Sequence, residues 1–292
     1  MASLMGTAMR LSTSLDALAA LAAHLRVETE QVEVSPQVRE LLAQVAEEVL
    51  GAPEAEDATA GPAVVGFARA FLRLATDLIE SPGRVGGWVH VDEALLQGIG
   101  RGSASIVEAF RAAEPVLDGL GERMAAGSAF LDVGTGTAWL AMATARIWPA
   151  ARVVGIDVYE PSLALARSNV AEAGLDRRVE LRLQDVTTLD EEAVYDAIWL
   201  PMPFLPAEIV PAAMAASARA LRPGGWLLPG TFAGPDDRLS QLLVDLRTVR
   251  SGGYPWRPDE LVETIAAHGF TGAREVPRTW TAPVRLYAGR RP

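Results

Sequence analysis

The stretch FLDVGTGTAWLA, residues 130–141, decides the fold of this 292-residue chain. It consists of an apolar strand-like run, an aspartate, a glycine-spaced turn and a helix-like run. Many α/β proteins use this order as a nucleotide cradle, because glycines let the backbone approach a ligand without side-chain clashes. The stretch therefore predicts an α/β domain with a nucleotide-like ligand, and its glycine spacing should indicate which ligand.

Short apolar runs alternate with helical stretches from residue 129 onward. The runs typical of strands are AFLDVG (129–134), ARVVGID (151–157), RVELRLQD (178–185), YDAIWLP (195–201) and GGWLLPGTF (224–232). This alternation predicts crossover units and a mostly parallel sheet covered on both faces. Two further strands, 272–280 and 283–291, are joined by only a few residues, so they should form an antiparallel hairpin.

The first 120 residues predict helices and require no strand. The expected helices cover 11–26, 35–51 and 62–81, with one or two more after a turn within 87–120. Ser35 stands at a cap position, Pro36 at the first helical position and Gly51 after the helix end. We therefore expect a helical N-terminal domain, residues 1–115, before a sheet domain, residues 116–292.

Composition excludes several classes of chemistry. The chain has no cysteine, which excludes disulfides, thiolate zinc sites and cysteine nucleophiles. Every basic residue is arginine, so a Schiff-base lysine and a phosphate-loop lysine are excluded as well. The formal charge of −11 disfavours a nucleic-acid partner, which needs a concentrated positive face. Without an apolar run of about 18 residues or a convincing signal peptide, we expect no membrane partner and a cytoplasmic protein.

The glycine spacing separates two ligand classes. A dinucleotide fingerprint, G-x-G-x-x-G, fits at Gly134 and Gly136 but places Trp139 where the third glycine is needed. The pattern D-x-G-x-G followed by a small residue fits better, with Asp132 before the glycines and Ala138 after them. A carboxylate at that strand end suits the ammonium group of S-adenosylmethionine.

On these residues the chain resembles the class I S-adenosylmethionine-dependent methyltransferases, over roughly residues 125–292. The motifs that carry the resemblance are LDVGTGTA, VVGIDVYEPSLALAR, VELRLQDV, YDAIWLPMPFLP and ALRPGGWLLPG. The resemblance implies a Rossmann-like α/β fold, a mostly parallel seven-stranded sheet with an antiparallel C-terminal hairpin after an all-α N-terminal domain. It also implies S-adenosyl-L-methionine as cofactor, S-adenosyl-L-homocysteine as product, and a helical region that serves as lid or dimerisation element.

The resemblance also implies which residues hold the cofactor. Asp132 faces the ammonium group, Asp157 accepts from the ribose hydroxyls, and Asp185 accepts from the adenine amino group. Asp157 would suit the ribose of a dinucleotide equally well, and Asp185 could instead be a loop acid. The predicted cofactor-binding residues are Asp132, Gly134, Thr135, Gly136, Asp157, Val158, Tyr159, Asp185, Val186 and Leu200.

The run LPMPF indicates the class of methyl acceptor. Enzymes that methylate amide or exocyclic amino nitrogens often have a polar residue before Pro-Pro-Tyr/Phe, and Leu200 stands in that place here. A glutamine or adenine nitrogen is thereby disfavoured. Met202 and Phe204, with Trp199, would line an apolar pocket for a small apolar or aromatic molecule, unless Trp199 points into the core.

His90 is the candidate base, because its segment joins the helical region to the sheet domain and folds over the cofactor in related enzymes. A base is needed only if the acceptor carries a proton that must leave. Trp88, Gln97 and Ser103, from the same region, are further candidates for acceptor contact beside Met202 and Phe204. The other histidines, at 24 and 268, are expected to be structural, and no metal ligands are predicted.

Two other functions remain open at this stage. The chain could bind S-adenosylmethionine as a non-catalytic regulatory protein, although retention of all three acids favours an enzyme. An oxidoreductase is supported by the glycine loop alone. The sequence leaves open whether oxygen, nitrogen or carbon is methylated, and whether the protein is a homodimer.

Overall fold

The computed structural model describes residues 3–51, 57–88, 90 and 92–292. The chain divides into two compact units. The first comprises residues 1–82 and 97–102, and the second comprises residues 83–96 and 103–292.

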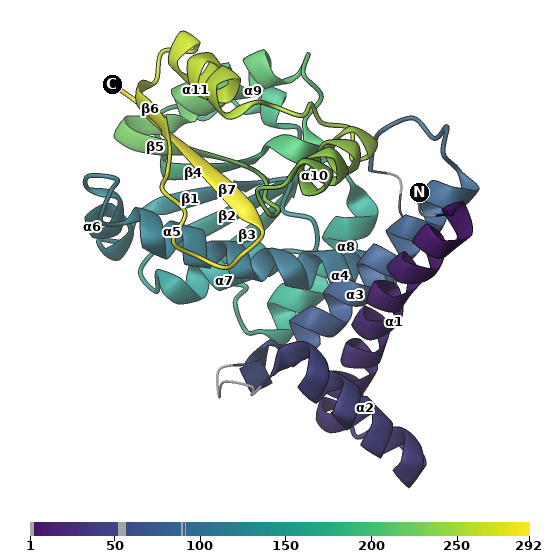
Figure 1. The fold of residues 1–292 in the computed structure, drawn as a ribbon. Coiled ribbons are helices and arrows are strands. Elements are labelled where there is room, and N and C mark those ends of the chain that lie inside the picture. Colours follow the sequence, from purple (N-terminus) through teal and green to yellow (C-terminus); the bar gives the residue numbers. More distant parts are fainter. Residues whose placement is uncertain (1–2, 52–56, 89, 91) are drawn as a thin grey trace. The chain divides into compact units, whose positions relative to one another are not determined.

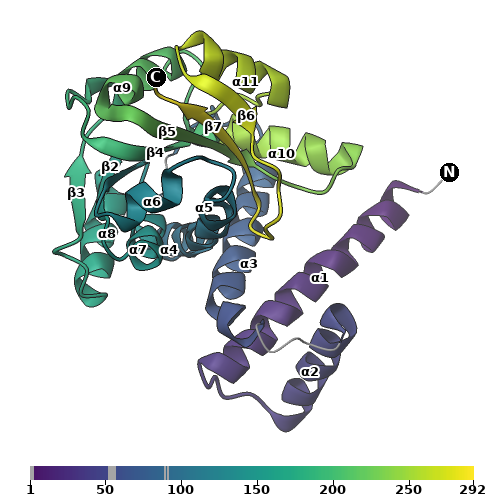
Figure 2. The same ribbon diagram turned by 90° about the vertical axis from the view of Figure 1, so that its left-hand side faces the viewer.

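The first unit is built from helices α1 (Leu4–Thr29), α2 (Pro36–Leu50) and α3 (Asp57–Glu80). Helix α1 packs against both α2 and α3 (Figure 2). The Ser35 side chain accepts from the Val38 amide, and Gly51 closes α2 with a φ of 70°, which confirms the predicted boundaries. Helix α1 is longer than predicted, because Ser3 caps it well before residue 11.

The connection to the sheet is helical in its described part, as expected. It contains α4 (Glu93–Ser103), the short η1 (Ala104–Ile106), α5 (Val107–Ala113) and α6 (Leu120–Ala125). Within the first unit, α4 and α3 approach at two glycines, since a Cβ on Gly98 would lie 2.7 Å from the Gly66 carbonyl oxygen.

The second unit contains a seven-stranded sheet in the order β3-β2-β1-β4-β5-β7-β6. Its strands are β1 (Ala129–Val133), β2 (Arg152–Asp157), β3 (Val179–Leu183), β4 (Tyr195–Pro201), β5 (Leu221–Phe232), β6 (Thr271–Glu275) and β7 (Val284–Arg290). Strands β1 to β5 are parallel, whereas β7 lies antiparallel between β5 and β6. The predicted fold class is confirmed, including the antiparallel C-terminal hairpin.

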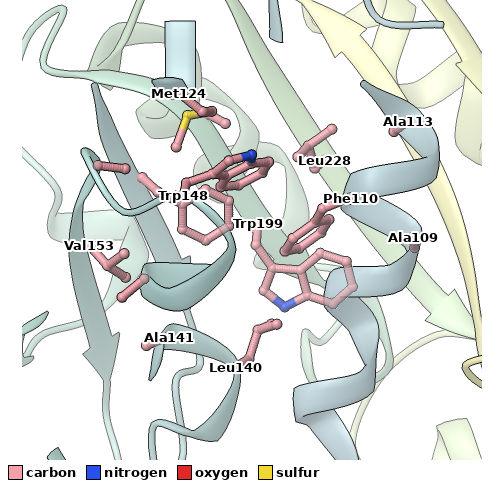
Figure 3. Close-up of a cluster of buried hydrophobic side chains, with 14 of the residues drawn as sticks. Ala109, Phe110, Ala113, Met124, Leu140, Ala141, Trp148, Val153, Trp199 and Leu228 are labelled. Atoms are coloured by element: carbon pink, nitrogen blue, oxygen red, sulfur yellow. The ribbon is translucent and has the colours of Figure 1, made fainter. Parts of the chain in front are cut away.

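Two apolar layers cover the two faces of this sheet (Figure 1). One layer comes from α5, α6, α7 (Trp139–Ile147) and α8 (Glu160–Glu172), and the other from α9 (Val210–Ala220) and α11 (Pro258–Ala267). Trp199 belongs to the first layer, where its ring meets Phe110 edge-on at 5.6 Å (Figure 3). Trp199 therefore points into the core rather than into an acceptor pocket.

Candidate cofactor and acceptor site

The topology of the sheet sets the position of the candidate site. Strand order reverses at β1, which lies between β2 and β4, and such switch points leave a crevice at the carboxyl ends of parallel strands. Asp132 lies near the carboxyl end of β1, Asp157 ends β2, and Asp185 follows β3. Three acidic residues therefore stand at the carboxyl ends of three adjacent strands.

The glycine loop after β1 is shaped by left-handed backbone. Gly134 and Gly136 have φ angles of 64° and 55°, a region that glycine adopts without strain. The Gly136 amide donates to Asp157 Oδ2 at 2.7 Å, which joins the loop to the end of β2. A Cβ built on Gly136 would meet nothing within 4 Å, so the loop has an open side where a ligand can approach.

Ala138 also adopts the left-handed conformation, with φ 64° and ψ 17°, and it is fully buried. The sequence suggested only that a small residue was needed here. The structure shows that the position has the backbone glycine prefers, so alanine bears a strain of about 1–2 kcal/mol. This strain supports a fixed loop geometry at the start of α7.

Asp132 is a buried carboxyl group with 1% of its surface exposed. Thr135 Oγ1 donates to its Oδ2 at 2.7 Å, and the absence of a side chain on Gly155 makes room for that hydroxyl. Burial raises the pKa of Asp132 from 3.8 to about 7, against the opposing effect of the Thr135 hydrogen bond, and the nearby Asp157 charge adds to the rise. A cationic group placed beside this carboxylate would relieve that cost.

The other two acids are held by local backbone. Asp157 Oδ1 accepts from the Tyr159 amide at 2.8 Å, and burial raises the pKa of Asp157. Asp185 caps the short helix η2 (Val186–Thr188), its Oδ1 accepting from both the amide and the hydroxyl of Thr187 at 2.8 Å. Capping of η2 uses the Oδ1 atom of Asp185. The predicted contact of Asp185 with adenine stays a prediction.

Two exposed apolar side chains lie beside these acids. Val158, directly after Asp157, is 67% exposed, and Leu183, at the end of β3, is 57% exposed. A flat apolar ring such as adenine could cover both. Val158 was predicted from its place after Asp157, whereas Leu183 was not predicted, because the residue pattern along β3 gives no sign of a ligand.

Leu200 and Met202 require a correction. Both side chains are fully buried in the core layer that includes α9 and α11. Because both side chains pack among core residues, we assign them to the core rather than to the cofactor or acceptor site. Phe204, at the end of η3 (Met202–Phe204), is half-buried and stays a candidate.

Trp88 and His90, within the second unit, contact residues that follow two different strands of the sheet. The Trp88 ring meets Phe204, after β4, edge-to-face at 5.5 Å. Two residues later, the His90 carbonyl accepts from the Tyr159 hydroxyl, after β2, at 2.9 Å. The geometry therefore brings Trp88, His90, Tyr159 and Phe204 together.

The segment that carries Trp88 and His90 is fastened at its start to the end of α10 (Arg238–Arg250). The Gly87 amide donates to the Arg250 carbonyl at 3.2 Å. A Cβ on Gly86 would lie 2.2 Å from the Val249 carbonyl oxygen, so no side chain fits there. Backbone packing at two glycines thus fixes how the segment enters the site.

Phe232 extends the aromatic group beyond the predicted residues. Its ring meets the Phe204 ring edge-to-face at 5.7 Å, and the Arg247 guanidinium lies over the Phe232 ring at 5.7 Å from its centroid. Gln97 belongs to the first unit and Ser103 ends α4, so their predicted contact with the acceptor stays a prediction. Phe232 could have been found as the last residue of β5, whose carboxyl end joins the same edge.

Comparison with known proteins agrees with this geometry. Residues 130–225 match the family model of a methyltransferase domain. A release factor glutamine methyltransferase from Gloeobacter violaceus is 29% identical over 160 residues, covering 44% of this chain and 56% of that protein. A malonyl-[acyl-carrier protein] O-methyltransferase from Xylella fastidiosa is 35% identical over 132 residues, covering 45% of this chain and 41% of that protein. The chain thus spans about half the length of these curated relatives.

Solved structures resemble the chain over its whole length. Human N-acetylserotonin methyltransferase in complex with SAM has a TM-score of 0.68 at 14% identity, covering 100% of this chain and 99% of that chain. Mitomycin 7-O-methyltransferase has a TM-score of 0.60 at 21% identity, covering 98% and 100%. At these identities the likeness shows the fold. Residues 130–225 thus match a methyltransferase domain, and the second unit has the fold of the S-adenosylmethionine-dependent methyltransferases.

The residues that the structure describes contain no group of three or more histidine, aspartate or glutamate side chains placed to hold a metal ion. None of their helices combines the length and apolar character needed to cross a membrane.

Replacing Asp157 with alanine should weaken binding of S-adenosylmethionine by about 10–100-fold, because hydrogen bonds to a charged group contribute about 1.5–3 kcal/mol. The variant also loses the Gly136 and Tyr159 contacts that hold the loop. Isothermal titration calorimetry measures the loss, with circular dichroism to confirm the fold. Unchanged affinity in a folded variant would contradict the placement of the ribose at the end of β2.

Proposed function

We propose that this protein transfers a methyl group from S-adenosylmethionine to a hydroxyl oxygen of a small aromatic molecule. The observation that carries the proposal is the aromatic group at the ends of β4 and β5, formed by Trp88, Phe204 and Phe232 beside His90. Flat apolar surfaces with a single imidazole nearby suit an aromatic acceptor that has one ionisable hydroxyl.

The residues at the strand ends fit the cofactor. The buried Asp132 carboxylate would hold the ammonium group, Asp157 the ribose hydroxyls, and the exposed Val158 and Leu183 the adenine ring. When bound, S-adenosylmethionine supplies an electrophilic methyl group on a sulfonium. The open side of Gly136 leaves room for a ligand at that end of the sheet, where Trp88 and His90 contact Phe204 and Tyr159 and would help to position the acceptor.

His90 is the residue we assign to the proton. A hydroxyl is a weak nucleophile until its proton leaves, and an imidazole nitrogen is the side-chain base best matched to neutral pH. The stretch from Leu200 to Ala207, at and after the carboxyl end of β4, contains no titratable side chain that could serve as the base instead. The His90 ring contacts the Trp88 ring edge-on at 5.2 Å, and the Tyr159 hydroxyl donates to the His90 backbone carbonyl. These two contacts would orient the His90 ring.

A second candidate is methylation of a glutamine amide in a protein, because several curated relatives are named as glutamine methyltransferases. Those matches cover less than half of this chain. The residue that would bind the amide is Leu200, which is apolar and fully buried. The site therefore lacks a polar partner for the planar nitrogen at that position, and the small-molecule acceptor is favoured.

The first unit stays a proposed lid or dimerisation element. Its exposed apolar side chains support a role in covering another surface. On α1 these are Leu4, Met5, Met9, Leu11 and Leu15.

The experiment that tests the proposal is methyl transfer from methyl-labelled S-adenosylmethionine to a panel of phenols and to a glutamine-bearing peptide. We expect label on the phenolic oxygen of at least one aromatic acceptor and none on the peptide. Label on the peptide alone would replace the proposal by the second candidate. Tight cofactor binding without transfer to any acceptor would indicate a binding protein rather than an enzyme.

A further inference from the structure

Helix α10 holds an arginine toward β5 while its large apolar side chains face solvent. Leu239, Leu243 and Val249 are 61%, 50% and 50% exposed, whereas Thr248 is buried and Arg247, over the last ring of β5, is half-buried. This arrangement reverses the usual one, because burying a leucine gains free energy and burying a guanidinium costs it. The inward position of Arg247 therefore calls for a role that offsets its desolvation.

Arg247 and His90 stand at the two ends of one series of ring contacts, all within the second unit. The Arg247 guanidinium lies 5.7 Å from the centroid of Phe232, whose ring meets that of Phe204 at 5.7 Å. The Phe204 ring meets the Trp88 ring at 5.5 Å, and the Trp88 ring meets that of His90 at 5.2 Å. The rings that we propose for the aromatic acceptor thus connect the proposed base to a cation.

The chemistry of Arg247 suits the binding of an anion. Burial lowers the pKa of Arg247 from its ordinary value, since desolvation disfavours the charged form, yet arginine stays protonated at neutral pH. The contact with Phe232 attracts the charge without neutralising it. With five N–H donors, a guanidinium can bind a carboxylate in addition to its contacts within the protein.

The electrostatics favour an acidic acceptor over a neutral one. An acceptor that covers these rings would remove more water from the guanidinium. A neutral acceptor would give no compensation for that loss, whereas a carboxylate would offset it with charge-assisted hydrogen bonds. The chain as a whole carries a formal charge of −11, so attraction of an anion to this place must come from a local cation such as Arg247.

We propose that Arg247 binds a carboxylate of the methyl acceptor and so selects an aromatic hydroxy acid. This proposal rests on the proposed function and narrows its acceptor. The aromatic ring of the acceptor lies against Phe204 and Phe232, its carboxylate meets Arg247, and its hydroxyl faces His90. Arg247 acts in this account on specificity, because the methyl group and the departing proton are both at the hydroxyl.

The test compares matched acids and amides on the full chain saturated with S-adenosylhomocysteine. The probes are 4-hydroxyphenylacetate and 3-(4-hydroxyphenyl)propanoate, each beside its neutral primary amide of nearly the same size and shape. Isothermal titration calorimetry gives the Kd of each probe for wild type and for Arg247→Gln. We expect wild type to bind at least one acid about tenfold more tightly than its amide. Arg247→Gln should weaken that acid about 10–100-fold and change the amide less than about threefold.

Two further variants serve as controls. Arg238→Gln removes the same charge from the exposed first residue of α10 and should leave both Kd values within about twofold. Arg247→Lys keeps the charge and should still prefer the acid, so it tests the proposal even if Arg247→Gln does not fold. Equal weakening of acid and amide in Arg247→Gln would show a merely structural role and overturn the proposal. Wild type that binds neither acid at millimolar concentration, or binds acids no more tightly than amides, would overturn it as well.

Failure of the proposed function gives a different result. Methyl transfer from labelled S-adenosylmethionine to the same four probes measures that function. Equal labelling of acids and amides would keep the proposed function and overturn the role of Arg247. Acids that bind through Arg247 but receive no label would keep the role of Arg247 and contradict the proposed function.

Discussion

Replacing His90 with asparagine should lower kcat about 10²–10⁴-fold, the range by which a positioned general base accelerates a reaction. The reason is that an acceptor hydroxyl would keep its proton during transfer. The Kd for S-adenosylmethionine should stay within about twofold, because the contact to Tyr159 uses the backbone carbonyl of His90. Steady-state kinetics with the acceptor found in the transfer screen, and calorimetry with the cofactor, measure the two effects.

The pH profile distinguishes a base from a merely structural histidine. The wild-type rate should fall at acidic pH as the imidazole is protonated, and the variant should lose that limb. His24→Asn, in α1 of the first unit, is the matched control and should leave kcat unchanged. A His90→Asn enzyme with full kcat and an unaltered pH profile would show that the proton leaves by another route.

Replacing Asp132 with asparagine should have two opposite effects. Cofactor affinity should fall at least about 100-fold, because the buried carboxylate supplies the charge for the cofactor ammonium. The free energy of unfolding at pH 8 should rise by up to about 4 kcal/mol, since the variant no longer buries a charge there. Asparagine keeps an oxygen for the Thr135 hydroxyl, so the loop retains that contact.

The sign of the pH dependence follows from the raised pKa of Asp132. Between 3.8 and about 7 the folded protein holds this proton and the unfolded chain does not. Its contribution to the free energy of unfolding is therefore fully present below pH 3.8 and is lost as pH rises to about 7. Urea denaturation of wild type and Asp132→Asn at several pH values isolates this contribution as their difference.

Cofactor binding should respond to the same proton in the opposite sense. Below pH 7 the wild-type Kd should rise about tenfold per pH unit, because the carboxyl must ionise before it can pair with the ammonium. Asp132→Asn should show a flat profile. Equal stability of both proteins at pH 8, or a wild-type Kd independent of pH, would mean that Asp132 is not the buried acid described above.

The fold was predictable from sequence because its signals are local. The alternation of β-rich runs with helices fixed strands β1 to β5, and the short link between 272–280 and 283–291 required an antiparallel pair. Helix α10 is absent from those expectations. Its leucines recur at helical spacing in the sequence, so the pattern was present although the helix was not predicted. In the structure these leucines face solvent. They are Leu239, Leu242, Leu243 and Leu246.

The candidate site was predictable only where a residue's role follows from its place on a strand. The acids at 132, 157 and 185 stand at strand ends, which the sequence marks. The sequence also places Leu200 in β4 and Met202 directly after it, but it does not show that they are buried. Their burial depends on packing against α9 and α11, which are distant in sequence. Phe232 joins the aromatic group of the site through tertiary contacts alone.

The central claim is that the crevice at the ends of β1, β2 and β3 binds S-adenosylmethionine. Calorimetric titration of the purified protein with S-adenosylmethionine, S-adenosylhomocysteine and NADH in parallel tests it most directly. We predict micromolar binding of the first two and no heat with NADH. Binding of NADH alone would contradict the assignment of the glycine loop, and binding of none of the three would contradict the cofactor site as a whole.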